Sequence, residues 1–320
     1  MFSQSRRGKK GLACGIVLIV MLAVLIVMTG NQGMAQAAEP KQKTFKSPDA
    51  AVKALVDATR ANDVKALEAL FGPGSKDMIS SGDDVDDARG RAMFVKSYDD
   101  AHRLEKAGDN KRILYVGKDD WPMPVPIVKV GKRWSFNTQE GREEILNRRI
   151  GKNELGAIQT CLAIVDAEKE YATLDRDNNQ LLEYTPKFAS EKGKKDGLYW
   201  EAAPGEPLSP MGPLVASATA EGYENPAQMS PYHGYLFRII TAQGENANGG
   251  AYGYIVNGNM IGGFAIVAYP ALYRASGVKT FIVNYEGVVY EKDLGPETAQ
   301  LAAAVTVFDP DKTWKKVEGQ

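Results

Sequence analysis

Cysteine is scarce in this sequence of 320 residues, which contains only two. Cys14 lies in an apolar run near the N-terminus, so the rest of the chain holds only Cys161. A single cysteine forms no internal disulfide. Cys161 stands between Ile158 and Leu162 in a helical pattern, which favours a small buried residue over a reactive thiol.

Histidine is equally scarce, with two residues, and this excludes most familiar catalytic and zinc sites. The sequence has no H-E-x-x-H, no paired-histidine zinc spacing and no G-x-S-x-G turn. Its glycine-rich stretch, residues 249–264, contains no G-x-x-x-x-G-K-[ST], so we expect bulges and close backbone approach there instead of a phosphate loop. We therefore predict no catalytic residue.

The sequence has one long hydrophobic run, at residues 11–29. Arg6, Arg7, Lys9 and Lys10 precede it, and Ala35-Gln36-Ala37 follows it. A basic segment, an apolar segment and a small-residue site form an export signal, with cleavage expected after Ala37. The run is also long enough to stay in the membrane as an anchor. Either way, the N-terminal segment meets the membrane and the rest lies in the periplasm or on the outer side of the cytoplasmic membrane.

An excess of basic residues is absent from the exported part. Without the four basic residues of the signal, 35 basic residues face 40 acidic ones, a net charge of −5. A nucleic-acid surface needs a basic patch, so we expect no nucleic-acid partner. The remaining length, about 283 residues, suits two domains.

The first predicted domain spans residues 44–140 and combines helices with a small sheet. Ser47 followed by proline predicts one helix start, and Asp63 predicts another. A third helix is expected from about Val85 to Leu104. Three strands then follow, at residues 112–117, 125–130 and 133–138. This order of elements resembles the nuclear-transport-factor-2-like class, and the resemblance implies a concave sheet.

The second predicted domain, residues 141–320, begins with a connecting helix expected over Asn153–Leu174. A mainly antiparallel sheet follows, with turns at Asn257-Gly258 and Glu286-Gly287. A short helix is expected over Glu297–Val305. The predicted fold class is therefore α+β.

Several long motifs resemble a family of bacterial exported proteins grouped as "domain of unknown function 2950". The motifs are SSGDDVDD (80–87), the run from Asp119 to Leu155, KKDGLYW (194–200), SPYHGYLFRIITAQG (230–244), the run from Gly249 to Pro270, and TFIVNYEGVVYEKDLG (280–295). The resemblance covers nearly the whole exported chain and implies an exported envelope protein. It brings no known activity, ligand or catalytic residue.

The second half also resembles a type IV pilin or pseudopilin head, in which a helix leads into an Asp-x-Asp loop and a sheet. The matching stretch is AEKEYATLDRDNNQLLEY, residues 167–184. In pilins the apolar membrane helix continues directly into this helix, whereas about 100 residues separate the two segments here. The resemblance is therefore architectural and does not imply assembly into a pilus.

Oxygen donors recur at alternate positions of this Asp loop. Asp175, Asp177, Asn179 and Glu183 supply side chains, and Leu181 supplies a backbone carbonyl. Such a set suits Ca²⁺, which takes six to eight oxygens. The spacing is not that of an EF-hand, because Gln180 and Pro186 stand where that motif has glycine and glutamate. The alternative is a polar loop whose side chains cap the local backbone.

Aromatic and basic residues surround the second histidine in PYHGYLFRI, residues 231–239. Strand alternation places His233 and Tyr235 on one face, and Tyr232 and Arg238 on the other. A packed, hydrogen-bonded ring is one interpretation of His233. The other is a surface on which His233 and Tyr235 bind sugar or peptide, a role that Tyr232 and Arg238 could serve on the opposite face.

Two acidic residues near tryptophans, Asp120 and Asp196, define the enzymatic alternative. Paired carboxylates hydrolyse glycosidic bonds when they lie about 5–10 Å apart. The resulting prediction is a non-catalytic binding or structural module of the cell envelope, whose partner is an envelope protein or polymer. The alternative is a carboxylate-dependent hydrolase of cell-wall or sugar polymers.

Overall fold

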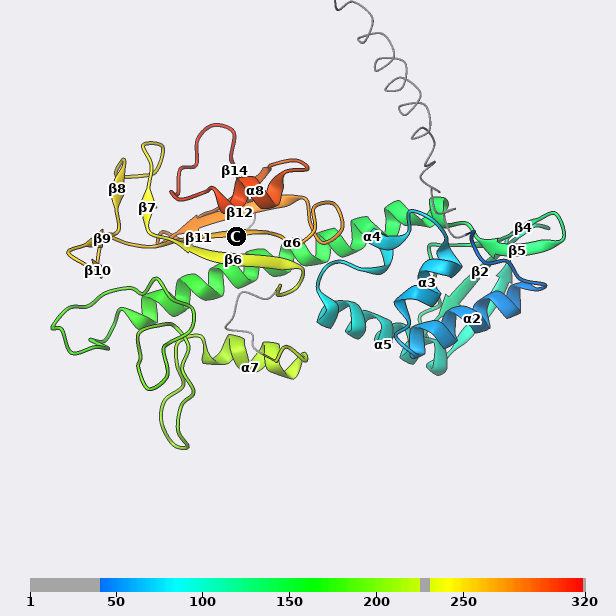
Figure 1. Ribbon diagram of the computed structural model, residues 1–320, viewed down its shortest axis with the longest axis horizontal. Coiled ribbons are helices and arrows are strands. Elements are labelled where there is room, and N and C mark those ends of the chain that lie inside the picture. The colour runs from blue at the N-terminus through cyan, green and yellow to red at the C-terminus, as the bar shows by residue number, and fades with distance from the viewer. Residues whose placement is uncertain (1–40, 225–230, 319–320) are drawn as a thin grey trace, which may run out of the picture. The chain divides into compact units, whose positions relative to one another are not determined.

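The structure, a computed structural model, describes residues 41–224 and 231–318 (Figure 1). The expected signal or anchor, residues 1–37, lies outside the described residues. The chain from Pro40 to Gln320 forms one compact unit. Helices combine with mostly antiparallel strands, which confirms the α+β class.

Four helices open the described chain, and the sequence explains their limits. They are α2 (Pro48–Arg60), α3 (Val64–Phe71), α4 (Lys76–Ile79) and α5 (Asp84–Asp100). Ser47 and Asp63 cap α2 and α3 as predicted, each accepting a hydrogen bond from a backbone N–H three residues on. Gly72 ends α3 with a φ of 83°, a conformation that favours glycine.

The first sheet has five strands within residues 41–224, two more than the three predicted. They are β1 (His102–Lys106), β2 (Lys111–Val116), β3 (Trp121–Pro122), β4 (Ile127–Val130) and β5 (Arg133–Phe136). The order is β1-β2-β4-β5, and β3 pairs with β2. The prediction of helix up to Leu104 was wrong, because α5 ends at Asp100 and β1 follows. Strand β1 is an edge strand with four of its five side chains exposed, so it lacks the apolar alternation that reveals a strand.

Helix α6 (Thr138–Tyr171) is a single helix of 34 residues, longer than predicted. Ile145, near its start, packs against the first hydrophobic cluster, to which α2, α3, α4 and the first sheet contribute. From Ala157 to Tyr171 its buried apolar side chains belong to a second cluster. Helix α6 (green in Figure 1) therefore has residues in both clusters.

The second cluster lies against an antiparallel sheet. The sheet has the order β14-β13-β12-β11-β6, and short strand pairs β7–β8 and β9–β10 accompany it. Two helices complete this part, one of which, α7, the sequence did not reveal. The elements are α7 (Gly212–Ala220), β6 (Tyr235–Ile240), β7 (Ala242–Gln243), β8 (Tyr252–Gly253), β9 (Ile255–Val256), β10 (Asn259–Met260), β11 (Ala265–Pro270), β12 (Lys279–Asn284), β13 (Val289–Asp293), α8 (Thr298–Ala303) and β14 (Lys315–Lys316).

Both predicted turns are confirmed. Asn257 and Gly258 connect β9 to β10, and both have positive φ, 50° and 91°. Two consecutive positive φ angles match the twist of a hairpin, and asparagine followed by glycine adopts them at low cost. Gly287, with a φ of 79°, lies in the turn between β12 and β13.

Asp83 fixes the start of α5 against a distant part of the chain. Its carboxylate accepts a hydrogen bond from Asp86 N at 3.0 Å, which caps the helix. It also accepts hydrogen bonds from Tyr223 Oη at 2.8 Å and Gly234 N at 2.9 Å. Asp83, Tyr223 and Gly234 are all buried.

Glu168 is a fully buried carboxyl in the second half of α6. Its Oε2 accepts a hydrogen bond from Thr185 N at 3.1 Å, and its Oε1 has no partner among the described residues. Burial raises the pKa of Glu168 to about 8, and the Thr185 hydrogen bond only partly opposes this.

Glu168→Gln should stabilise the protein near pH 8. Between about pH 4.3 and 8 the folded state holds a proton that the unfolded chain has released, so stability falls as pH rises through this window. Glutamine cannot ionise, and we expect the free energy of unfolding at pH 8 to increase by roughly 2 kcal/mol. Urea unfolding at a series of pH values measures this. Glu170→Gln, on the exposed face of α6, is the control, and an equal effect of both variants would contradict the prediction.

Asp83→Ala should destabilise the protein far more than Asp63→Ala. Loss of either residue removes a helix cap, at about 1 kcal/mol. Loss of Asp83 also leaves two buried donors without an acceptor, at about 1–3 kcal/mol each. We expect a difference of at least about 2 kcal/mol between the variants in urea unfolding. Similar losses would mean that the contacts of Asp83 with Tyr223 and Gly234 contribute little.

Candidate functional site

The five residues of the predicted Ca²⁺ loop lie together after α6, and all but Glu183 are exposed. Asn179 Nδ2 donates to Asp177 Oδ2 at 3.1 Å and to Glu183 Oε1 at 2.7 Å. Asp175 accepts from the backbone N–H groups of Asn179 and Gln180. Within residues 41–224 and 231–318, no group of three or more histidine, cysteine or acidic side chains is placed to hold a metal ion. The side chain of Asn179 organises the loop.

His233 lies in a turn before β6 and is not part of a strand. Its φ is 50°, so strand alternation does not describe where its side chain points. Its ring stacks on Tyr232 with centroids 4.1 Å apart. Its Nε2 lies 2.6 Å from Glu221 Oε2. Gly156 of α6 leaves room for the ring, because a Cβ there would approach His233 Nδ1 to 3.2 Å.

The other two residues of the predicted ligand face lie elsewhere. Tyr235 is 0 % exposed, and its hydroxyl donates to Lys279 O at 2.9 Å. Arg238 donates to Ala302 O at 2.9 Å, at the end of α8. The structure therefore brings Tyr232 and His233 together but not with Tyr235 and Arg238.

His233 ends a chain of hydrogen bonds and ion pairs that reaches α5 and α6. Arg89 binds the same Glu221 carboxylate and also donates to Asp86 at 2.6 Å, and Lys152 donates to Asp86 at 3.0 Å. Burial raises the pKa of Glu221, but hydrogen bonds and charges from His233 and Arg89 outweigh it and hold the pKa below its usual value. These charges are paired with one another, which suits a structural network.

The two acids of the hydrolase alternative are each paired with a cation. Asp120 accepts from Arg103 Nε at 2.9 Å. Asp196 accepts from Lys187 Nζ at 2.7 Å and from Glu191 N at 2.9 Å. Each carboxylate thus has a basic side chain as a partner.

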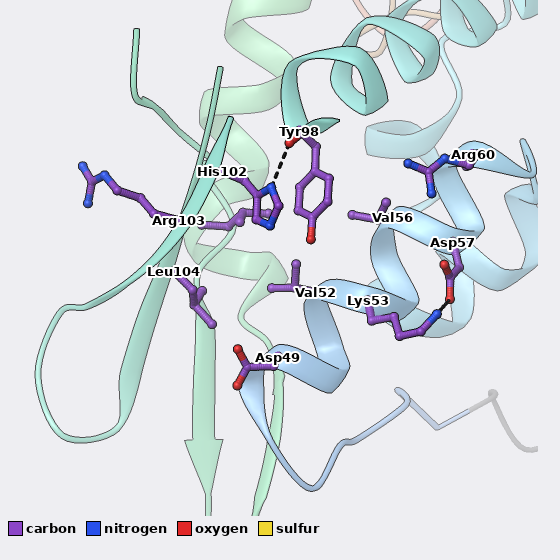
Figure 2. A pocket seen from close by; sticks show the side chains of 11 residues that line it. Asp49, Val52, Lys53, Val56, Asp57, Arg60, Tyr98, His102, Arg103 and Leu104 are labelled. Atoms are coloured by element: carbon purple, nitrogen blue, oxygen red, sulfur yellow. Dashed lines mark hydrogen bonds and ion pairs between the residues drawn. The ribbon is translucent and has the colours of Figure 1, made fainter. Parts of the chain in front are cut away.

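A cavity of about 470 Å³ contains the other histidine, His102, in strand β1 (Figure 2). Its ring stacks on Tyr98 with centroids 3.8 Å apart, and its Nδ1 lies 2.9 Å from Tyr98 O. Lys53 and Asp57, on the opposite wall, pair at 2.6 Å. Figure 2 shows both contacts, which engage His102, Lys53 and Asp57 with the protein itself.

A second cavity, of about 490 Å³, lies among α2, α3, α4, α5, β3 and the first half of α6, and we call it the α5 cavity. Its walls are mainly apolar. The apolar lining residues are Leu55, Leu67, Phe71, Met78, Ile79, Phe94, Trp121, Met123, Pro124 and Ile145. The volume falls within the range of small-molecule sites, and an apolar wall with a few polar groups is typical of them.

Charged side chains line part of the α5 cavity. They are Asp86, Asp87, Arg91, Arg148, Arg149 and Lys152, four basic and two acidic residues. Asp86 is held by Arg89 and Lys152, and Asp87 accepts from Ser81 N at 2.8 Å. The lining therefore has an excess of positive charge.

Trp121 is the exposed aromatic residue of this lining, with 40 % of its surface accessible. The guanidinium of Arg148 lies over its ring, 5.2 Å from the centroid. The opening of the α5 cavity thus has an aromatic and a basic group side by side. Sequence reasoning identified helical stripes that contribute to the walls, but an apolar stripe does not reveal that its packing leaves a cavity.

No helix within the described ranges, 41–224 and 231–318, is long and apolar enough to cross a membrane. Comparison with curated proteins and with solved structures finds no match, so the resemblances to nuclear-transport-factor-2-like proteins and to pilins stay predictions. A family model described as "Protein of unknown function (DUF2950)" matches residues 42–317. This match extends over most of the sequence, and the chain belongs to the DUF2950 family.

Proposed function

We propose that this protein is an exported, non-catalytic binding module of the cell envelope and that the α5 cavity is its ligand site. The observation that carries the proposal is the cavity itself, about 490 Å³ of space with mainly apolar walls. The cavity is open to solvent, so its apolar walls are accessible to a ligand, as in most small-molecule sites.

The N-terminal sequence supports the location. Its basic segment, apolar run and A-x-A site have the order of an export signal. The proposed place of work is the periplasm or the outer side of the cytoplasmic membrane, with residues 11–29 as anchor if the signal is retained. An envelope polymer or protein is then a further partner for the same module.

A binding role fits the chemistry of the cavity better than a catalytic one. A general acid or base needs a proton that it can exchange with a substrate. The two carboxylates of the lining, Asp86 and Asp87, instead hold cations and a backbone N–H of the protein. No observation favours the hydrolase alternative.

Gly90 provides a direct test of the α5 cavity. It lines the cavity within α5, and a Cβ added there meets no atom within 4 Å. Gly90→Phe should therefore fold and fill the cavity. We expect it to lower the affinity for N-phenylnaphthylamine, a neutral fluorescent dye, at least tenfold, while Gly90→Ala keeps it.

Gly151→Phe is the matched control, because Gly151 is an exposed helical glycine with the same free space around its Cβ. Dye titration and thermal unfolding of all variants measure binding and folding separately. Saturable binding that survives Gly90→Phe, or no saturable binding by the wild type, would refute the α5 cavity as the ligand site.

Ca²⁺ binding by the Asp loop stays a prediction with its own test. Ca²⁺ at 100 times its dissociation constant would stabilise the protein by about 2.7 kcal/mol, and Asp177→Ala should abolish that gain. Thermal unfolding in EDTA and in millimolar Ca²⁺ measures it, with Asp166→Ala, an exposed acid of α6, as control. An unchanged Tm would leave the hydrogen bonds of Asn179 as the whole organisation of the loop.

A further inference from the structure

Two arginines from different helices meet at the end of α4. Arg149 of α6 donates hydrogen bonds to Asp77 O at 2.7 Å and to Met78 O. Arg91 of α5 donates to Ile79 O at 3.1 Å and to Asn62 Oδ1. Three consecutive carbonyls of α4 thus hold two guanidinium groups side by side, and both groups line the α5 cavity.

Neither guanidinium forms an ion pair within 4 Å of a carboxylate in the described part of the chain. The nearby acids have other partners, since Asp77 binds Arg142 and Asp86 binds Arg89 and Lys152. Burial lowers the pKa of Arg149, the charges of Asp87, Asp86 and Asp77 oppose this, and the like charge of Arg91 adds to the lowering. Three carboxylates thus act on Arg149 from a distance, but none is bonded directly to either guanidinium in the described part of the chain.

The hydrogen bonds of Arg149 and Arg91 to the carbonyls of α4 stabilise this short helix, but they account for only part of the role of the two arginines. Cations near the last carbonyls of a helix are stabilising, and α4 has only four residues. However, a guanidinium has five N–H groups, and Arg149 uses two of its nitrogens on these carbonyls, while its Nε–H has no partner among the described residues. Donors remain for a ligand, and guanidinium groups suit carboxylate and phosphate.

We propose that the ligand of the α5 cavity is a single-chain amphiphile with an anionic head. Its apolar chain lies against the apolar walls, and its carboxylate or phosphate accepts hydrogen bonds from Arg149 and Arg91. This inference rests on the proposed function and names the class of ligand. Burial of apolar surface stabilises the chain of the ligand, and charge-assisted hydrogen bonds stabilise its head.

Three probes with twelve-carbon chains separate the head from the chain: laurate, dodecanol and dodecyltrimethylammonium, each below its solubility limit or micelle concentration. Displacement of N-phenylnaphthylamine from the full chain, with Pro40–Gln320 as a parallel sample, measures their affinities. We expect laurate to bind at least tenfold more tightly than dodecanol, and dodecyltrimethylammonium to bind most weakly. Equal binding of laurate and dodecanol would overturn the anionic head but leave the cavity as a binding site. No binding of any probe would overturn the proposed function as well.

Variants locate the head within the cavity. Arg149→Gln and Arg91→Gln should each weaken laurate about tenfold and leave dodecanol unchanged, and Arg149→Lys should restore part of the loss. Arg133→Gln is the matched control, because Arg133 also donates to a carbonyl, Thr44 O at 2.6 Å, but does not line the cavity. Unchanged laurate binding by both variants would overturn the assignment. If Arg149→Gln does not fold, Arg91→Gln and the wild-type probe series still decide it.

A carboxylate and a phosphate head could come from a free fatty acid or from a lysophospholipid. Competition between laurate and lysophosphatidylglycerol distinguishes these sources. Displacement of laurate by the lysophospholipid supports a phosphate head, and its failure to displace laurate supports a carboxylate. In both cases we expect binding of the head to depend on Arg149. Displacement of laurate that is unchanged in both Arg149→Gln and Arg91→Gln would count against the proposal.

Discussion

The carboxylate of Asp83 is the interaction on which much of the structure depends. It caps α5 locally and accepts hydrogen bonds from Tyr223 and Gly234, which lie about 140 and 151 residues further along the chain. One side chain therefore sets where α5 begins and what it packs against. Because α5 contributes Gly90, Arg91 and Phe94 to the cavity wall, the shape of the cavity depends on this contact, although Asp83 does not line it.

Helix α6 adds a second constraint, because it belongs to both hydrophobic clusters. Its first half supplies Arg148, Arg149 and Lys152 to the cavity, and its second half buries Cys161 and Glu168. The buried ionisable group in the second cluster and the cations at the cavity thus belong to one continuous helix.

Local signals in the sequence predicted much of the fold and little of the site. Caps and turns, such as Ser47, Asp63 and Asn257-Gly258, depend on neighbouring residues and were read correctly. Strand β1 was not predicted, because its side chains are mostly exposed and show no apolar alternation. His233 was assigned a strand face because alternation assumes extended backbone, whereas its φ of 50° places it in a turn. Arg91 and Arg149 carry no local signal, because their relation arises only when α4, α5 and α6 pack together.

The α5 cavity combines two features that each cost free energy. Its apolar walls are accessible to solvent instead of being covered by other apolar groups. Guanidinium groups that are partly removed from water, without a carboxylate partner, lose solvation that carbonyl oxygens restore only in part. An apolar chain would relieve the first cost and an anionic head the second. Both costs arise in the same cavity, so a single amphiphile can relieve them together, whereas a purely apolar or a purely charged ligand would relieve only one.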